Sequence, residues 1–248
     1  MQRPWCISQP NNFMDQLETG IRYFDLRVET FMPWFKGERN YKFVHGLVGP
    51  STDELFHQLS EFLARPENDK EVVILDFQQF FGFGDVMHEH FVGILRRTFV
   101  EKLASSDLGV DVTLDELWKG ASRIVVFYAD VTAVKENDFL WPRDQLESNW
   151  PNAQDSSGVV SYLEGQLPYE EQKFFVLQGV ITPSMSTFKN SMIPLSIDPS
   201  SLLDLGKHVN PLWETKLKEW KHKGVNVVMV DHANYSPSFV ETVVALNS

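Results

Sequence analysis

Short apolar runs alternate with amphipathic segments along this chain, and no other feature of the sequence restricts the fold as strongly. Runs with the length and composition of strands cover residues 21–28, 41–44, 71–77, 122–129, 174–182 and 226–230. Alternation of this kind is typical of a parallel sheet, either doubly wound or closed into a barrel. No glycine fingerprint for a dinucleotide or a nucleoside triphosphate follows any run, and polar residues collect at the strand ends, which favours the barrel.

Capping signals mark the helices between these runs. Ser51 with Glu54 and Thr113 with Glu116 have the spacing of capping boxes, and Pro211 is typical of a first helical turn. Helices are therefore expected over residues 13–19, 52–65, 85–103, 108–120, 158–166 and 211–224, with a last one opening at 236–237.

Two segments, residues 130–155 and 183–199, lack a sustained period and are expected to be long loops. The first contains two Trp-Pro steps, at Trp141 and Trp150. Exposed tryptophans near a barrel mouth suit contact with a membrane, whereas burial in the core is the commoner fate of this residue. The sequence leaves both fates open.

Composition excludes several classes of function. The formal net charge is -12, from 34 acidic and 22 basic residues, which argues against nucleic-acid binding and against purely electrostatic docking on anionic lipid. The single cysteine excludes an internal disulfide and suits a reducing compartment. No run has the length of a transmembrane helix or the pattern of a signal peptide. We therefore expect one domain over residues 1–248 and a cytoplasmic location.

The run GIRYFDLRV and the following YKFVHG carry the residues with chemical potential. Asp25 and Arg27 are two apart in a strand that we expect to be buried on both faces, so both side chains point to one side. His45 ends the next strand. A histidine beside this carboxylate and this guanidinium would combine a proton donor, a group that orients it and a cation that holds an anion. Those are the parts of an acid-catalysed phosphoryl transfer.

The same residues have a purely structural interpretation. Asp25 and Arg27 would then form an ordinary buried ion pair, and His45 would be a loop histidine with satisfied hydrogen bonds. The spacing alone does not decide between these interpretations.

A family resemblance favours the functional interpretation. The run QLETGIRYFDLRV, then FVHG, then EVVILDFQQFF, resembles the X box of the phosphatidylinositol-specific phospholipases C. The chain is most similar to small eukaryotic proteins that consist of an X domain only, and the likeness extends from WCISQPNNF to VVMVDHANYSPSFVETVVALN. It implies an irregular TIM-like (β/α) barrel in which the first family strand is missing, so that the domain is incomplete at its N-terminus.

The resemblance also implies roles for individual residues. In the family, the inositol 2-hydroxyl attacks its own phosphodiester, which releases a cyclic phosphate and diacylglycerol. His45 matches the general acid, Asp25 the carboxylate that orients it, and Arg27 the phosphate-binding position. Asp231 matches the carboxylate that orients the general base, and Gln78 aligns with a polar site residue. Calcium-dependent members carry an acidic pair where this chain has Asp25 and Arg27, so the site is expected to need no metal and no other cofactor.

The general base of the family is the one part without a match. It is a histidine in a PGSHD-like motif, and no histidine precedes Asp25 in this chain. His232 follows Asp231 directly, but neighbouring residues of a strand point to opposite faces, which argues against it as a substitute. Because loss of a general base costs about two to four powers of ten in rate, we expect impaired hydrolysis.

Three hypotheses therefore remain at the level of sequence. The first is a phosphoric diester hydrolase of the phospholipase C type in lipid metabolism or signalling, with a phosphoinositide or its head group as partner and transient contact with a membrane surface. The second is a non-catalytic module that binds a phosphoinositide or a protein. The third is a poorly stable barrel fragment. A glycerophosphodiesterase is a more distant alternative, because it would need a cluster of carboxylates around a metal.

Overall fold

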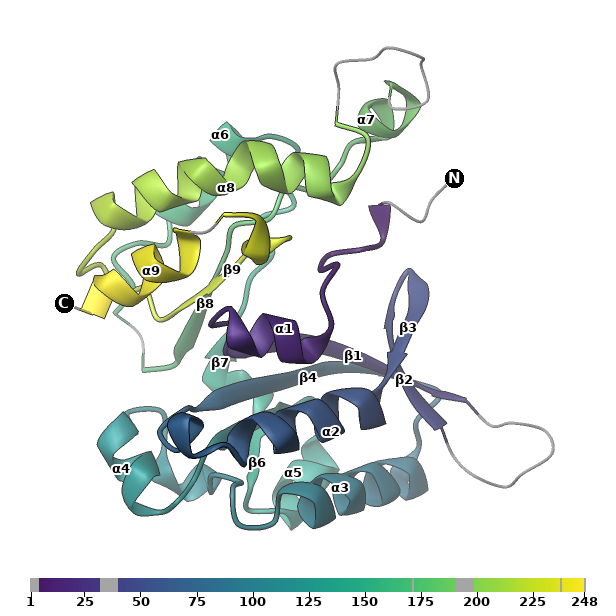
Figure 1. Ribbon diagram of the computed structural model, residues 1–248. Coiled ribbons are helices and arrows are strands. Elements are labelled where there is room, and N and C mark those ends of the chain that lie inside the picture. The colour runs from purple at the N-terminus through teal and green to yellow at the C-terminus, as the bar shows by residue number, and fades with distance from the viewer. Residues whose placement is uncertain (1–4, 32–39, 171, 191–198, 237, 248) are drawn as a thin grey trace. The chain divides into compact units, whose positions relative to one another are not determined.

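The computed structural model describes residues 5–31, 40–170, 172–190, 199–236 and 238–247 (Figure 1). The chain forms two compact units. The first spans Phe13–Leu146 and is called the N-terminal unit below. The second consists of the described residues of Met1–Asn12 and Glu147–Ser248 and is called the C-terminal unit.

The N-terminal unit is an α/β structure built around a six-stranded sheet with the order β3-β2-β1-β4-β5-β6. Strands β1, β4, β5 and β6 are parallel neighbours, whereas β2 and β3 form an antiparallel extension on the other side of β1. Its elements are α1 (Phe13–Glu18), β1 (Tyr23–Phe31), β2 (Asn40–His45), β3 (Leu47–Ser51), α2 (Thr52–Leu63), β4 (Val73–Phe81), α3 (Asp85–Phe99), α4 (Leu114–Lys119), β5 (Ile124–Tyr128), α5 (Val131–Glu136) and β6 (Leu140–Pro142), with short 3-10 turns at Pro66–Asn68, Ser106–Leu108 and Arg143–Gln145.

The core of this unit lies on one face of the sheet. Phe24, Leu26 and Val28 alternate along β1 with half-buried residues, and the buried set packs in one cluster with Leu75 of β4 and Leu59 of α2. The expectation that β1 is buried on both faces is therefore wrong: its alternation is that of a strand with one apolar and one polar face. The polar face of β1 carries Asp25 and Arg27.

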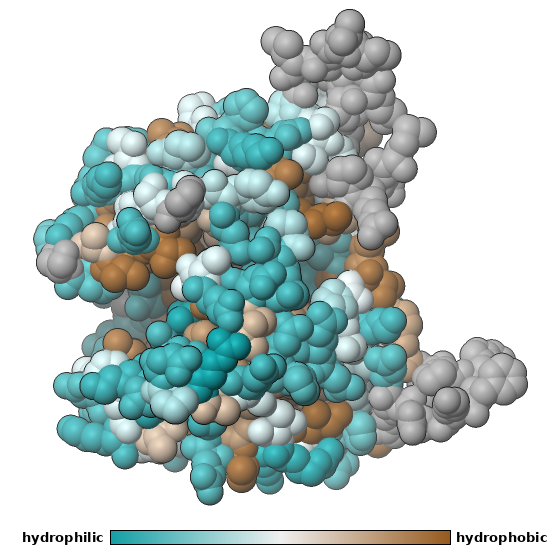
Figure 2. Space-filling view, viewed as in Figure 1, coloured by the Kyte–Doolittle hydropathy of each residue, from teal (hydrophilic) through white to brown (hydrophobic). Residues whose placement is uncertain are grey.

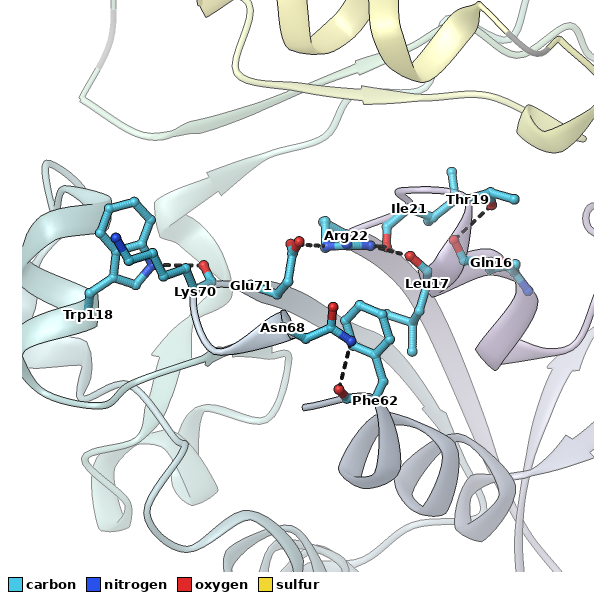
Figure 3. A network of polar contacts seen from close by, with 10 residues as sticks. All are labelled: Gln16, Leu17, Thr19, Ile21, Arg22, Phe62, Asn68, Lys70, Glu71 and Trp118. Carbon is cyan, nitrogen blue, oxygen red and sulfur yellow. Dashed lines mark hydrogen bonds and ion pairs between the residues drawn. The ribbon is translucent and has the colours of Figure 1, made fainter. Parts of the chain in front are cut away.

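A polar network fixes the N-terminal ends of β1 and β4 (Figure 3). The Arg22 Nε atom lies 2.7 Å from Glu71 Oε2, and Arg22 Nη1 donates to the Leu17 carbonyl oxygen over 2.6 Å. The Arg22 guanidinium also lies over the Phe62 ring, on the core side of the sheet. These contacts join α1, the start of β1, α2 and the start of β4.

The outer helices of this unit follow the capping signals. Ser51 accepts a hydrogen bond from the Glu54 backbone N–H at the start of α2, and Thr113 and Glu116 form a complete capping box on α4. In the space-filling view, the surface over α2 is mostly hydrophilic with isolated hydrophobic residues (Figure 2). Helix α2 therefore presents its apolar side to the sheet and its charged side outward.

The C-terminal unit contains the parallel strands β8 (Phe174–Gln178) and β9 (Val227–Met229), which form a three-stranded sheet with β7 (Leu146–Glu147), a strand that begins at the boundary between the units. Its helices are α6 (Ser156–Glu164), α7 (Met185–Asn190), α8 (Leu202–Glu219) and α9 (Phe239–Val244), with 3-10 turns at Ala233–Tyr235 and Ala245–Asn247. None of the helices in the described ranges is long and apolar enough to cross a membrane.

Three predictions about secondary structure are wrong. Helix α8 begins nine residues before Pro211, because the Ser201 side chain caps it by accepting from the Asp204 N–H. Its buried residues Leu202, Val209 and Trp213 lie along one face, and this packing outweighs the cost of an internal proline.

The second wrong prediction concerns residues 130–155. They form α5, β6, a 3-10 turn and β7 instead of one continuous loop. Trp141 belongs to β6 and is 0% exposed, whereas Trp150 is 57% exposed. Of the other expected loop, residues 183–199, α7 occupies 185–190, and 191–198 lie outside the described residues.

Candidate active site

Four of the five predicted site residues lie in the N-terminal unit. Asp25 and Arg27 are on β1, His45 is the last residue of β2, and Gln78 is on β4. Because β1 continues to Phe31, Asp25 and Arg27 lie in the middle of the strand and not near its end as expected. Gln78 likewise lies inside β4, which is longer than the predicted strand.

A local irregularity directs Gln78 toward Asp25. Leu26 pairs with Phe77 and Arg27 with Gln79, so Gln78 is an extra residue in β4. Such bulges re-aim a side chain and are frequent beside active sites. The Gln78 side chain forms a hydrogen bond with the Asp25 carboxylate, which can only accept, so the amide N–H is the donor.

The structure brings Asp25, Arg27 and His45 into electrostatic contact. The Arg27 Nε atom lies 3.9 Å from Asp25 Oδ1, a loose ion pair in which the Arg27 side chain is 36% exposed. Both residues lie close enough to His45 to shift its protonation. A carboxylate, a guanidinium and an imidazole therefore share one neighbourhood.

The pKa values of the carboxyl and the imidazole move in opposite directions. Burial raises the pKa of Asp25, and the charges of Arg27, His45 and Arg143, together with the Gln78 hydrogen bond, lower it in part. Partial burial of the imidazole lowers the pKa of His45, the charge of Arg27 lowers it further, and the charge of Asp25 raises it. Asp25 is therefore the group that favours the protonated imidazole.

Sequence reasoning missed three further residues on this polar face. Asp76 of β4 is 0% exposed, and its carboxylate accepts a 2.7 Å hydrogen bond from the Tyr23 hydroxyl. Arg143 Nε lies 2.8 Å from the other Asp76 oxygen as an ion pair. Burial raises the pKa of Asp76 to about 6, against the effects of Arg143 and Tyr23. The lone charge in the run VVILDF was a usable signal for Asp76, but nothing marked Arg143.

Asp231, the fifth predicted residue, lies in the C-terminal unit, two residues after β9. Its carbonyl oxygen accepts a 3.0 Å hydrogen bond from Asn210 Nδ2. The following His232 is 2% exposed, has a left-handed backbone with φ of 53°, and donates its N–H to the Ser8 carbonyl oxygen over 2.8 Å. The assignment of Asp231 to the base position remains a prediction.

The other histidines of the N-terminal unit have local partners. His88 Nδ1 lies 2.9 Å from the Tyr128 hydroxyl, and His90 Nδ1 lies 2.8 Å from the Tyr41 hydroxyl. They engage different elements, as their spacing on α3 predicts. Across the described ranges, no group of three or more His, Cys, Asp or Glu side chains is arranged to hold a metal ion.

Solved structures identify the fold. The phosphatidylinositol-specific phospholipase C from Listeria monocytogenes matches with a TM-score of 0.68 at 15% identity, over 100% of this chain and 86% of that chain. A pentafluoro-Phe-containing form of the Staphylococcus aureus enzyme matches with a TM-score of 0.71, also at 15% identity and with the same coverage. The fold is therefore the irregular TIM-like α/β barrel of the phosphatidylinositol-specific phospholipases C, as predicted.

Curated relatives identify the family. PI-PLC X domain-containing protein 3 of Danio rerio is 31% identical over 255 residues, which cover 100% of this chain and 74% of that protein. The Homo sapiens protein of the same name is 31% identical over 249 residues, which cover 100% of this chain and 75% of that protein. The chain belongs to the PI-PLC X domain-containing protein family. No family model matches it.

Proposed function

We propose that the chain binds the phosphodiester of a phosphoinositide at Arg27 and that His45 acts there as a general acid. The observation that carries this proposal is the meeting of Arg27, Asp25 and His45 on adjoining strands of one sheet. A guanidinium supplies a permanent positive charge with a fork of N–H donors that fits two phosphate oxygens. The exposure of Arg27 leaves it accessible to such an anion.

The proposed reaction is an internal displacement at phosphorus. The inositol 2-hydroxyl oxygen forms a new bond to phosphorus, and the bond from phosphorus to the diacylglycerol oxygen breaks. His45 gives its proton to that leaving oxygen, and Arg27 offsets the negative charge that builds on the phosphoryl oxygens. Asp25 stabilises the protonated imidazole, and the Gln78 amide holds Asp25 in place. The products are a cyclic inositol phosphate and diacylglycerol.

Removal of the proton from the 2-hydroxyl is the weak step in this chain. In the family a histidine takes this proton, and none of the residues described above is assigned that role. We propose that a water molecule takes it instead, which is slower than transfer to a positioned side chain, so that turnover by this chain is slow. The missing match also favours a second candidate function, which is phosphoinositide binding without hydrolysis.

The lipid surface that would present this substrate has a candidate contact beside His45. Leu47 and Val48 are the first residues of β3, directly after the turn at Gly46, and they are 43% and 53% exposed. Exposed apolar side chains gain free energy when they enter the acyl boundary of a bilayer. We propose that these two residues touch the membrane transiently during substrate binding.

The test is release of cyclic inositol phosphate from phosphatidylinositol vesicles in excess EDTA. The proposal predicts a low rate that EDTA does not change and that falls to background for His45→Ala and Arg27→Gln. Arg22→Gln is the matched control, because Arg22 pairs with Glu71 on the core side of the sheet and should keep the wild-type rate. Vesicle binding that requires Arg27, without any release, would select the non-catalytic function. If the chain neither releases cyclic inositol phosphate nor binds vesicles through Arg27, both candidate functions are refuted.

A further inference from the structure

The buried ion pair between Asp76 and Arg143 lies directly beside the candidate site. Asp25 of β1 and Asp76 of β4 are opposite each other in the parallel register, so their side chains share one face of the sheet, about 4.8 Å apart at the backbone. Two carboxylates in that position repel each other unless cations lie next to them. Each has one: Arg27 beside Asp25 and Arg143 beside Asp76.

The guanidiniums of Arg143 and Arg27 differ in the contacts that hold them in place. Arg143 is anchored at two points, by the Asp76 carboxylate at 2.8 Å and by the Leu146 carbonyl oxygen, which accepts from Nη1 over 2.9 Å. The Tyr23 hydroxyl fixes the far oxygen of Asp76. Within the part of the chain that the structure describes, Arg27 is held by the 3.9 Å contact with Asp25 alone, so an arriving phosphate can draw it away. When Arg27 binds the phosphate, the Asp25 carboxylate loses the cation beside it. Another cation then has to remain near Asp25 to stabilise its negative charge.

We propose that Arg143 is a positioning residue: held by Asp76, its guanidinium stabilises the Asp25 carboxylate as an anion beside His45 while Arg27 engages phosphate. This inference rests on the proposed function of Arg27 and His45. It assigns to Asp76 and Tyr23 the role of holding Arg143, and it explains why a carboxylate is fully buried beside a second one.

The groups that face Asp25 come from every strand packed against β1. They are Arg27 and Tyr23 on β1, His45 on β2, Asp76 and Gln78 on β4, and Arg143 after β6. Arg143 lowers the pKa of Asp25 but has no resolved direct effect on His45. Arg143 should therefore affect the His45 imidazole through the charge of the Asp25 carboxylate. The sign of the change in the His45 pKa distinguishes this indirect effect from a direct one.

The experiment is an NMR titration of the His45 imidazole in the full chain, without substrate. In Arg143→Gln, Asp25 loses a stabilising cation and takes up a proton at higher pH, so the pKa of His45 falls, by about half a unit. A direct effect of removing a cation would instead raise that pKa. Arg143→Lys should restore most of the wild-type value, and Arg22→Gln should leave it unchanged.

The Asp25→Asn variant serves as a second background, in which a positioning role of Arg143 can be separated from a general structural effect of its loss. In Asp25→Asn, the added Arg143→Gln substitution should produce no further fall. If Arg143→Gln does not fold, the double variant Asp76→Asn/Arg143→Gln removes both buried charges together and should give the same fall in the His45 pKa.

Two results would overturn the inference: an unchanged or raised His45 pKa in a folded variant that lacks Arg143, or a fall that persists in the Asp25→Asn background. The titration needs no substrate, so it reports on Arg143 even if the hydrolysis and binding assays refute the proposed function.

Discussion

At the scale of single residues, His45 is governed by two neighbours of opposite effect. Burial lowers the pKa of His45 below its ordinary 6.5, Arg27 lowers it further, and Asp25 raises it in part. Arg27→Gln should therefore raise the imidazole pKa relative to wild type, and Asp25→Asn should lower it. An NMR titration of the wild type and both variants checks these signs, and equal values in all three would contradict the proposed neighbourhood.

The raised pKa of Asp76 predicts a pH dependence of stability. Burial moves it from an ordinary 3.8 to about 6, so the folded state holds a proton that the unfolded state has already lost in this window. The stabilisation is complete below about pH 4 and disappears as the pH rises through about 6, a change on the order of 3 kcal/mol.

Urea unfolding of the wild type and of Asp76→Asn at several pH values measures this contribution. The free energy of unfolding of the wild type, minus that of the variant, should fall between pH 4 and pH 7. A difference that stays constant across this range would show that Asp76 does not titrate there.

At the scale of elements, helix α2 covers the core face of the sheet. Leu59 is fully buried there, and His57 lies on the exposed side of the same helix. Leu59→Ala should lower the free energy of unfolding by about 2–5 kcal/mol, because it leaves a cavity in the core, whereas His57→Ala should change it by about 0.5 kcal/mol or less. Equal effects in a thermal or chemical unfolding experiment would contradict this packing.

The β2–β3 turn with the first two residues of β3, Leu47 and Val48, gives the element-scale test of membrane contact. The double substitution Leu47→Ser/Val48→Ser should weaken binding to phosphatidylinositol vesicles by about tenfold, since it removes two exposed apolar side chains beside the site. Val100→Ser is the matched control, because Val100 is exposed at the end of α3. A sedimentation assay in which both variants bind like the wild type would remove this turn from the membrane contact.

The elements also show what local sequence signals can predict. Capping signals and short apolar runs predict α2, α4, β1 and β5, because each depends on interactions within a few residues. The antiparallel addition of β2 and the internal Pro211 of α8 depend on packing between distant segments, which no local pattern reveals.

The residues of the candidate site likewise fall into those that local sequence signals predict and those that depend on distant packing. Asp25, Arg27 and His45 stand out because charged residues interrupt apolar strands. Arg143 does not, because it reaches Asp76 only through the position of β6 in the sheet.

At the scale of the whole molecule, the function depends on what the candidate site binds. The chain shares the fold of the phosphatidylinositol-specific phospholipases C and belongs to the PI-PLC X domain-containing proteins. Its net charge of -12 makes binding of an anion by bulk electrostatics unfavourable. Binding of a phosphorylated head group therefore has to depend on a local cation, and the account assigns that role to Arg27.

The most direct test is calorimetric titration with inositol 1-phosphate, a soluble head group that excludes any contribution from the membrane. Arg27→Gln should weaken binding at least about tenfold, because a charge-assisted contact is lost, and Arg22→Gln should bind like the wild type. The same affinity for wild type and Arg27→Gln, or no binding by the wild type, would contradict the claim that this is a phosphoinositide site.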